Sequence, residues 1–374
     1  MKSNTSGKRI VITGGHLTPA FAVLELLKAK GWKIYWFGEK KAVSGEKVKT
    51  LEYKVIPEHG IPFYSITSAK LRRSAKLKSL LFLWKIPFGF FQSLSLLVGI
   101  KPDVLLSFGG YLSVPVVLAA WILRTPVILH EQTASPGLAN KLVARFATKV
   151  AISFPGTQTA FPKSKVVLTG NPIRKSIFRI ANARREKGLG NPPVLYITGG
   201  SRGSRIINQA VLSILPELLG EFMVYHQTGD LDFPNFLAVH NKLPEKMREW
   251  YDVSANYSFI QVEEIFNRVD FAVSRAGANS VLEFATLGVP AVLIPLPHAG
   301  SHEQEANAKA LAGYGLAIVL PQDKLSGALL LAKLREILEK IDEIKKYGKS
   351  ARLLVKTDAA ERILTLIEEQ WQKD

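Results

Sequence analysis

Short apolar runs alternate with helical segments along almost the whole chain, and this alternation restricts the fold more than any other feature of the sequence. The runs are continuously apolar, which is typical of parallel strands buried on both faces of a sheet. Helices are expected between them, over 19–30, 114–123 and 204–219. The predicted fold class is α/β with doubly wound parallel sheets. The expected strands are 9–12, 33–37, 104–108, 126–129, 149–152, 166–169, 194–198, 222–226, 257–260, 271–274, 291–295 and 317–320.

The strand pattern restarts once in the middle of the chain. An apolar strand enters a Gly-Gly turn at Val11–His16, and Tyr196–Ser201 repeats that arrangement. A polar, basic stretch near 174–191 lies between the two halves and predicts a linker. Two Rossmann-like domains in tandem place the carboxyl ends of their strands at a cleft that binds ligands. The expected divisions are 1–174, 175–355 and a last helical segment, 356–374, whose packing on the first domain the sequence leaves open.

Composition narrows the classes of function. Cysteine is absent, which excludes a disulfide framework, a thiolate metal site and a cysteine nucleophile. The 49 basic and 31 acidic residues give a net charge of +18, which favours an anionic partner such as a phosphorylated substrate, a membrane surface or nucleic acid. The apolar run Ile10–Ile12 ends at once in a glycine turn and is too short for a signal peptide, so we expect a cytoplasmic protein.

Residues 59–102 contain no acidic residue, and their basic residues are interleaved with aromatic ones. A transmembrane helix needs about 20 apolar residues, and Leu80–Ile100 is long enough but is interrupted by Lys85 and Pro87. A buried helix with solvated basic flanks is the second interpretation. We favour a third, a membrane-surface patch with aromatic side chains in lipid and cations over anionic headgroups. Its candidate residues are Lys70, Arg72, Arg73, Lys76, Phe82 and Trp84.

Two glycine turns follow strands of the first half, at Thr13–His16 and Gly109–Tyr111. Glycine lets the backbone approach a phosphate, and a helix N-terminus favours negative charge. A turn that requires glycine only for its backbone conformation is the alternative. The spacing is not G-x-G-x-x-G and no acidic residue closes the next strand, which disfavours a dinucleotide oxidoreductase. Because both turns belong to one sheet edge, together they favour an anion site.

Polar residues also close other strands. His130 and Glu131 end one strand of the first half, although such side chains often only satisfy the loop backbone. In the second half, Gly199–Gly203 offers backbone N–H groups, a hydroxyl and a cation to a diphosphate, while Ser201 is equally suited to cap a helix. Small residues from Ser274 onward lead to Glu283, whose carboxylate can accept both hydroxyls of a ribose. A lone glutamate on a helix is otherwise a solvated residue.

In combination, these segments resemble the MurG family of peptidoglycan glycosyltransferases, glycosyltransferase family 28. The resembling segments are Thr13–His16 with Pro19, Gly109–Tyr111 with Pro115, His130–Gln132, Pro136–Lys141, Gly170–Arg174, Gly199–Ser201 with Asn208, His226–Gly229, Ser274–Ala278 with Glu283, and Gln304 with Asn307. The resemblance implies a GT-B fold and an inverting transfer of N-acetylglucosamine from UDP-GlcNAc to the C4 hydroxyl of lipid I. It also implies a peripheral enzyme at the cytoplasmic face of an anionic membrane, with no cofactor, metal or nucleic-acid partner.

The resemblance further implies roles for single residues. Glu283 would hold the ribose, the Ile260 backbone the uracil and the turn at Ser201 the diphosphate. Inversion needs a base for the acceptor hydroxyl, and an imidazole is suited to that near neutral pH; the base is His16, with His130 or Glu131 as rivals. The catalytic candidates are His16 and Glu131. The donor candidates are Thr13, Gly14, Gly15, Arg174, Gly200, Ser201, Ile260, Arg275, Ala278, Asn279, Glu283, Gln304 and Asn307, and the acceptor candidates are Gly109, Gly110, Tyr111, His130 and Asn140.

Three alternatives stay open at this point. One is a different GT-B enzyme, either a glycolipid synthase or a UDP-sugar epimerase. Another is a membrane-bound pseudoenzyme, and the third is a nucleic-acid-binding protein suggested by the net charge. The chain departs from the usual pattern of the resembled family at Val11-Ile12, Phe108 and Thr133, all in the first half, and at Glu303 in the second.

Overall fold

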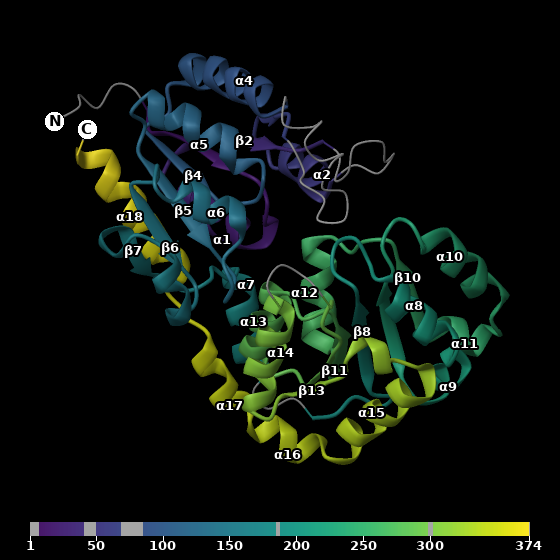
Figure 1. Ribbon diagram of the computed structural model, residues 1–374. Coiled ribbons are helices and arrows are strands. Elements are labelled where there is room, and N and C mark those ends of the chain that lie inside the picture. Colours follow the sequence, from purple (N-terminus) through teal and green to yellow (C-terminus); the bar gives the residue numbers. More distant parts are fainter. Residues whose placement is uncertain (1–6, 41–49, 69–84, 185–187, 298–301, 374) are drawn as a thin grey trace. The chain divides into compact units, whose positions relative to one another are not determined.

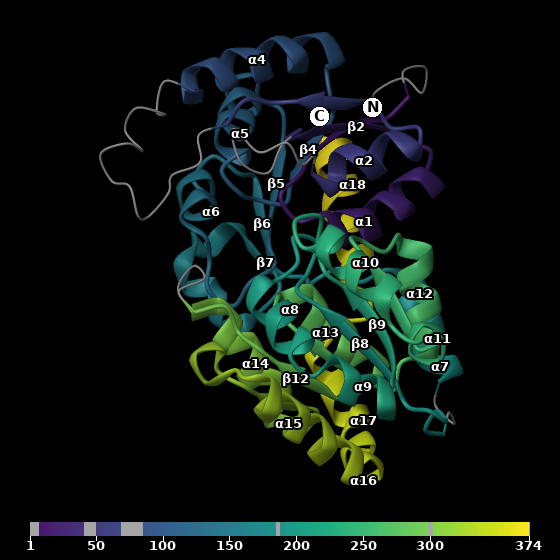
Figure 2. The ribbon, with the colours of Figure 1, turned by 90° about the vertical axis from the view of Figure 1, so that its right-hand side faces the viewer.

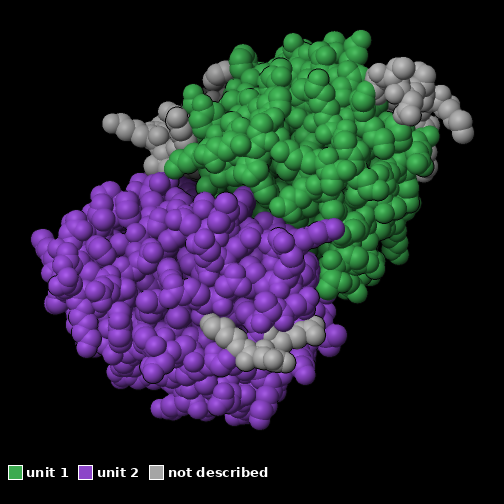
Figure 3. Space-filling model, turned by 180° about the vertical axis from the view of Figure 1, so that it is seen from behind, with its two compact units in different colours: residues 1–173, 356–374 green, residues 174–355 purple. Residues whose placement is uncertain are grey.

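The computed structural model describes residues 7–40, 50–68, 85–184, 188–297 and 302–373 (Figure 1). The chain divides into two compact units (Figure 3). Unit 1 comprises residues 1–173 and 356–374, and unit 2 comprises residues 174–355. The six candidate residues of the membrane patch, Lys70, Arg72, Arg73, Lys76, Phe82 and Trp84, lie outside the described residues.

Unit 1 is built on a seven-stranded parallel sheet with the strand order β3-β2-β1-β4-β5-β6-β7. The order reverses at β1, as in doubly wound sheets, so the turns after β1 and β4 lie side by side at one edge. The strands are β1 Arg9–Thr13, β2 Lys33–Gly38, β3 Phe63–Ser65, β4 Val104–Ser107, β5 Val127–Glu131, β6 Lys149–Ile152 and β7 Val166–Leu168.

Both faces of this sheet are buried, because alternate residues of each apolar strand point to opposite faces. Val11, Leu105 and Leu129 contribute to a core with side chains of α4, α5 and α6. On α18, Trp371 meets Trp32 edge to face at 6.2 Å, and the helix packs beside α1 (Figure 2). The helices of unit 1 are α1 Leu17–Ala29, α2 Leu51–Glu58, α4 Lys85–Ile100, α5 Ser113–Ile122, α6 Leu138–Val143 and α18 Ala359–Lys373.

Unit 2 contains a six-stranded parallel sheet with the order β10-β9-β8-β11-β12-β13. Again the order reverses beside the first strand, which puts the turns after β8 and β11 at one edge. The strands are β8 Val194–Thr198, β9 Met223–Gln227, β10 Tyr251–Ser254, β11 Phe271–Ser274, β12 Ala291–Leu293 and β13 Ala317–Val319.

Helices cover both faces of this second sheet as well. One face packs against α8, α9 and α15, with Leu195, Ile197 and Val273 in a shared core; α7 packs with α12 and α13. The helices are α7 Lys175–Ala183, α8 Arg205–Leu212, α9 Leu215–Glu221, α10 Phe233–Lys242, α11 Glu245–Glu249, α12 Phe259–Arg268, α13 Ala278–Leu287, α14 Glu303–Gly313, α15 Gly327–Glu339, α16 Ile341–Lys346 and α17 Gly348–Ala351.

Two sequence predictions about elements are wrong. Residues 257–260 are not a strand, because Ser258 and Gln261 form a capping box that begins α12, and the strand is β10 instead. The predicted helix 204–219 is two helices, α8 and α9, with Pro216 in the first turn of the second one. The short edge strand β3 is an element that the sequence analysis missed.

None of the helices that the structure describes is long and apolar enough to cross a membrane. The described part of the acid-free segment 59–102 includes α4, which packs against α5.

Candidate functional site

The turn between β1 and α1 is held tightly by its neighbours. Thr13 is buried, and its hydroxyl donates to Ser107 Oγ on β4 at 2.9 Å. The N–H of Gly14 donates to the carbonyl of Phe37 at 2.8 Å. Gly15 has a φ of +139°, and a Cβ there would lie 2.7 Å from the carbonyl oxygen of Gly109. The two glycine turns of unit 1 are therefore in contact, and their close approach requires glycine.

The second glycine turn is built against α6. Gly109 and Gly110 have φ values of +80° and +79°, and a Cβ on Gly109 would lie 2.5 Å from Asn140 Oδ1. Tyr111, which follows them, is exposed. The structure thus brings together the predicted residues of these two turns and Asn140.

His16 precedes α1 in an extended conformation, and its side chain forms no capping hydrogen bond. Burial lowers the pKa of His16 to about 4. The His16 imidazole is therefore uncharged at physiological pH. The uncharged imidazole is the form that can accept a proton.

His130 at the end of β5 is completely buried. Its Nε2 lies 3.3 Å from the carbonyl of Gly170 and 3.4 Å from Ser153 Oγ. Burial lowers the pKa of His130 to about 4 despite the hydrogen bond that its ring donates to the Gly170 carbonyl, and the positive charge of protonated His16 lowers it further.

Glu131 is buried and engaged within its own loop. Oε1 accepts from the backbone N–H of Thr133 at 3.0 Å and from its hydroxyl at 2.8 Å. Oε2 accepts from Asn140 Nδ2 at 2.8 Å and from the N–H of Gly137 at 3.2 Å. These bonds tie the loop after β5 to α6, which is a structural role and does not support Glu131 as a catalytic base.

In unit 2 the turn after β8 is equally constrained. A Cβ on Gly199 would lie 2.2 Å from the Ser204 nitrogen, and one on Gly203 would lie 1.9 Å from the Thr228 carbonyl oxygen. Gly200, with a φ of +83°, donates its N–H to Thr198 Oγ1 at 3.0 Å. Ser201 is exposed at the tip of this turn. The hydroxyl of Ser204, the residue before α8, is buried without a partner among the described residues, so polar groups concentrate at this helix start.

A buried network that the sequence analysis did not identify supports this turn. Asn208 on α8 donates to the Thr228 carbonyl at 2.9 Å and to Asp232 at 2.8 Å. His226 lies 3.1 Å from Asn208 Oδ1 and 2.9 Å from the Tyr251 hydroxyl. Burial lowers the pKa of His226 to about 3. Only the resemblance singled out His226 and Asn208, and it assigned them no contacts.

Arg174, Glu263 and Glu283 form a charged cluster at the start of unit 2. The Arg174 guanidinium, only 2% exposed, donates to Glu263 Oε1 at 2.8 Å and lies 3.9 Å from Glu283 Oε1. The ring of Phe259 covers it at 4.6 Å. Burial raises the pKa of Glu283, an effect that Arg174 opposes. The sequence analysis missed Glu263 and Phe259, because no sequence pattern links them to Arg174, which opens unit 2 about 85 residues earlier.

Ile260 follows Phe259 in the first turn of α12, and its side chain is 72% exposed. Its backbone is therefore at the helix start that the capping box organises. Ala278 and Asn279 begin α13, the helix that carries Glu283. The structure accordingly places Ile260 at the start of α12, and Ala278 and Asn279 at the start of α13. Each of these two helices contributes one carboxylate to the Arg174 cluster.

The side chains of the remaining donor candidates form hydrogen bonds with the loops after β11 and β12. The Arg275 guanidinium donates to the carbonyl of Ile294 at 3.1 Å and to Gln322 Oε1 at 2.7 Å, so this side chain supports protein loops. Gln304 Oε1 accepts from the N–H of Leu296 at 2.9 Å. Asn307 Nδ2 donates to the Ala276 carbonyl at 3.1 Å, while its buried Oδ1 has no partner among the described residues.

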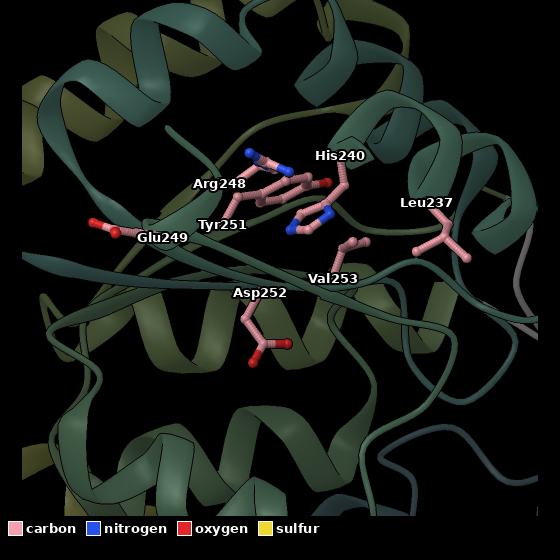
Figure 4. A pocket seen from close by; sticks show the side chains of 7 residues that line it. All are labelled: Leu237, His240, Arg248, Glu249, Tyr251, Asp252 and Val253. Carbon is pink, nitrogen blue, oxygen red and sulfur yellow. The ribbon is translucent and has the colours of Figure 1, made fainter. Parts of the chain in front are cut away.

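A surface cavity of about 290 Å³ lies elsewhere in unit 2, beside the edge strand β10 (Figure 4). None of the predicted site residues lines it. Its lining residues are Leu237, His240, Arg248, Glu249, Tyr251, Asp252 and Val253. The predicted site and this cavity are therefore separate features.

Comparison with protein families decides the class of the chain. Residues 11–152 match the glycosyltransferase family 28 N-terminal domain, and residues 194–363 match the C-terminal domain of that family. The chain belongs to glycosyltransferase family 28. Both glycine turns of unit 1 fall in the first match, and the β8 turn with the Arg174 partners Glu263 and Glu283 falls in the second.

Curated relatives in family 28 cover nearly the full length of the chain. A Lachnoclostridium phytofermentans protein is 37% identical over 97% of this chain and 99% of its own. A Bacillus cereus protein is 36% identical over 92% of this chain and 97% of its own. Both are named UDP-N-acetylglucosamine–N-acetylmuramyl-(pentapeptide) pyrophosphoryl-undecaprenol N-acetylglucosamine transferases.

Solved structures agree with this placement. The crystal structure of Acinetobacter baumannii MurG is 27% identical, matches with a TM-score of 0.69 and covers 97% of this chain and 99% of its own. The predicted MurG resemblance and GT-B fold class are thereby confirmed. A UDP-GlcNAc 2-epimerase from Neisseria meningitidis bound to UDP-GlcNAc has a TM-score of 0.65 at 13% identity, over 97% of this chain and all of its own. That likeness shows the fold alone.

Proposed function

We propose that this protein transfers N-acetylglucosamine from UDP-GlcNAc to the C4 hydroxyl of the muramoyl sugar of lipid I, forming lipid II with inversion at the sugar carbon. The single observation that carries the proposal is the near-full-length similarity to transferases named for that reaction. The two glycine turns in contact in unit 1, and the polar helix starts of unit 2, supply groups of the kind that this chemistry needs.

We assign the donor nucleotide to unit 2. Glu283 accepts hydrogen bonds from the ribose hydroxyls. Its carboxylate lies beside Arg174 at the start of the unit. The diphosphate binds at the β8 turn, where the backbone of Gly200, the hydroxyl of Ser201 and the start of α8 favour an anion. The buried Oδ1 of Asn307, which has no hydrogen-bond partner within the described part of the chain, accepts a hydrogen bond from a hydroxyl of the sugar.

We assign the acceptor to unit 1, beside the Gly109 and Gly15 turns. His16 takes the proton of the attacking hydroxyl, because it follows the glycine turn that contacts Gly109; its lowered pKa keeps the imidazole uncharged at physiological pH but also makes it a weaker base. His130 is the less suitable base, because its Nε2 already lies near the Gly170 carbonyl and it is completely buried. Glu131 positions the loop through Asn140.

The leaving UDP gains negative charge as the sugar departs. The start of α8 and the N–H groups of the glycine turn stabilise that charge electrostatically. Arg174 acts at the nucleotide side of the site. It keeps the Glu283 carboxylate oriented, and it lowers the pKa of Glu283, which burial raises.

We propose that unit 1 docks peripherally on the cytoplasmic face of the membrane. Phe88 and Phe91, one turn apart on α4, are 55% and 66% exposed. Leu138 and Leu142 on α6 are also exposed, and α5 packs with both helices. Exposed large apolar side chains on two helices that both pack on α5 suit a lipid surface, and the segment that precedes α4 in the sequence contains the cations Lys70 and Arg72, which suit anionic headgroups.

The test of the transfer is a reaction of the purified protein with labelled UDP-GlcNAc and a short-chain lipid I analogue. We expect one disaccharide product, with a β linkage by NMR and one UDP released per transfer. Conversion of UDP-GlcNAc in the absence of acceptor would indicate an epimerase instead. Absence of both products with intact UDP-GlcNAc binding would indicate a pseudoenzyme.

A further inference from the structure

The carboxylate of Glu52 lies at the ends of β1 and β2, against the turn that leads to His16. A Cβ on Gly14 would lie 1.8 Å from Glu52 Oε2. A Cβ on Gly38, at the end of β2, would lie 2.9 Å from Glu52 Oε1. The carboxylate thus occupies space left open by two glycines, one directly after β1 and one at the end of β2.

Hydrogen bonds hold the carboxylate in this position. Oε1 accepts the backbone N–H of Glu39 at 2.7 Å, and Oε2 accepts the indole N–H of Trp36 at 3.3 Å. Trp36 is completely buried on β2. Both donors therefore belong to β2 or to the residue that follows it, and they aim the carboxylate at the β1 turn.

The helix that carries Glu52 is also anchored here. Thr50 caps α2 by accepting the N–H of Tyr53 on its hydroxyl oxygen at 3.3 Å. The same hydroxyl donates to the carbonyl of Glu39. Glu39 therefore bonds both the cap and the carboxylate, which fixes the first turn of α2 over the end of β2.

The backbone of the β1 turn links Glu52 to His16. Gly14 is pinned by its hydrogen bond to Phe37 and covered by Glu52, and Gly15 is in contact with Gly109. The His16 side chain makes no capping bond of its own. The position of the imidazole therefore depends on the backbone of the two residues before it.

We propose that Glu52 is a positioning residue, which fixes the β1 turn and through it His16 without touching the substrate. The proposal rests on the role of His16 as general base stated above. A misplacement of about 1 Å can lower a rate by about 100-fold, so removal of the carboxylate should lower kcat and leave the affinity for UDP-GlcNAc unchanged.

The chain offers a matched pair of variants for the test. Gly14→Ala places a methyl group where the carboxylate lies, and Glu52→Ala removes that carboxylate. Gly14 does not have a positive φ, so alanine meets no left-handed strain there, and the three atoms nearest to the added methyl group all belong to Glu52. We expect each variant to lower kcat by about 10- to 100-fold, and the double variant to be no worse than either. Glu52→Gln, which keeps one acceptor oxygen, should recover part of the rate.

A multiplied loss in the double variant would overturn the proposal, because the Gly14 methyl group would then act on the substrate directly. An increase in acceptor KM with normal kcat would overturn it too. The NMR signal of the His16 ring gives a readout independent of turnover, and it should shift in both single variants, with melting temperatures showing that they are folded. If the wild-type protein transfers no sugar, the proposed function fails, whereas an unmoved His16 signal defeats only the role of Glu52.

Discussion

Arg174 Nη1 donates to Glu263 Oε1 at 2.8 Å, while Arg174 Nη2 lies 3.9 Å from Glu283 Oε1. One nearly buried cation therefore serves two carboxylates, and only one of these is assigned to the donor ribose. Ser176 also donates to Glu263, at 2.6 Å. Glu263 is thus satisfied by the protein itself, which leaves Glu283 as the group available to a ligand.

Replacement of Glu283 by alanine should weaken UDP-GlcNAc binding. Hydrogen bonds to a charged group contribute about 1.5–3 kcal/mol each, so the loss corresponds to a tenfold or larger increase in Kd. Isothermal titration of UDP-GlcNAc measures it. Glu264→Ala, which removes the exposed carboxylate next to Glu263 on α12, is the matched control and should bind normally. Normal affinity in a folded Glu283→Ala variant would remove Glu283 from the donor site.

Replacement of Arg174 by methionine should destabilise the protein by about 2 kcal/mol. Loss of one member of a fully buried pair costs about 3–5 kcal/mol, and Glu263 is 30% exposed, which screens part of the effect. Urea unfolding measures the change. The double variant Arg174→Met/Glu263→Met should regain part of the stability, because it removes the Glu263 carboxylate that the single variant leaves without its cation, while Glu283 still lacks Arg174. If the double variant were less stable than the single variant, packing and not charge would dominate the contribution of this position to stability.

Acid should destabilise the protein through three histidines whose pKa is lowered in the folded state. Burial lowers the pKa to about 4 for His16 and His130 and to about 3 for His226, against an ordinary value of 6.5. Below pH 6.5 the unfolded chain binds protons that the folded one does not, so the free energy of unfolding falls as the pH falls. Each histidine should contribute about 2 kcal/mol between about pH 7.5 and pH 5.

Urea titrations across that pH range measure the effect. His226→Gln removes one titrating group outside the proposed site and should give a shallower pH dependence than the wild-type protein. An unchanged slope in this variant would mean that His226 is protonated in the folded state.

Phe88→Asp/Phe91→Asp should release the protein from vesicles that contain anionic lipid. The substitutions remove two exposed rings from α4 and add charges that the anionic surface repels. Flotation with anionic and neutral vesicles measures binding. Leu353→Asp is the matched control, because Leu353 is 75% exposed in unit 2 on the short helix Arg352–Leu354. Equal binding by both variants would show that α4 does not contact lipid.

The fold could be predicted from the sequence because its signals are local. A continuous apolar run that ends in Gly-Gly identifies β1 and β8, and both lie in the middle of their sheets. The edge strand β3 has only three residues and carried no such signal. Tyr257–Ile260 has the composition of a strand, but the capping bonds between Ser258 and Gln261 begin a helix there.

Contacts within the site could be predicted only in part. The glycine turns were recognisable as segments, whereas the closeness of Gly15 to Gly109 depends on the strand order. No sequence pattern indicates that the Arg275 guanidinium points toward the Ile294 carbonyl. Glu52 lies 38 residues from Gly14 in the sequence, and only the folded β1–β2 edge brings the two together.

The kinetics of His16→Ala at saturating UDP-GlcNAc test the central claim most directly. If His16 takes the proton of the acceptor hydroxyl, kcat should fall by about 10²- to 10⁴-fold, with donor affinity nearly intact. His16→Gln should bind both substrates and should not restore the rate. A near-normal kcat with a raised acceptor KM would contradict the account, because His16 would then only orient the acceptor and another group would take the proton.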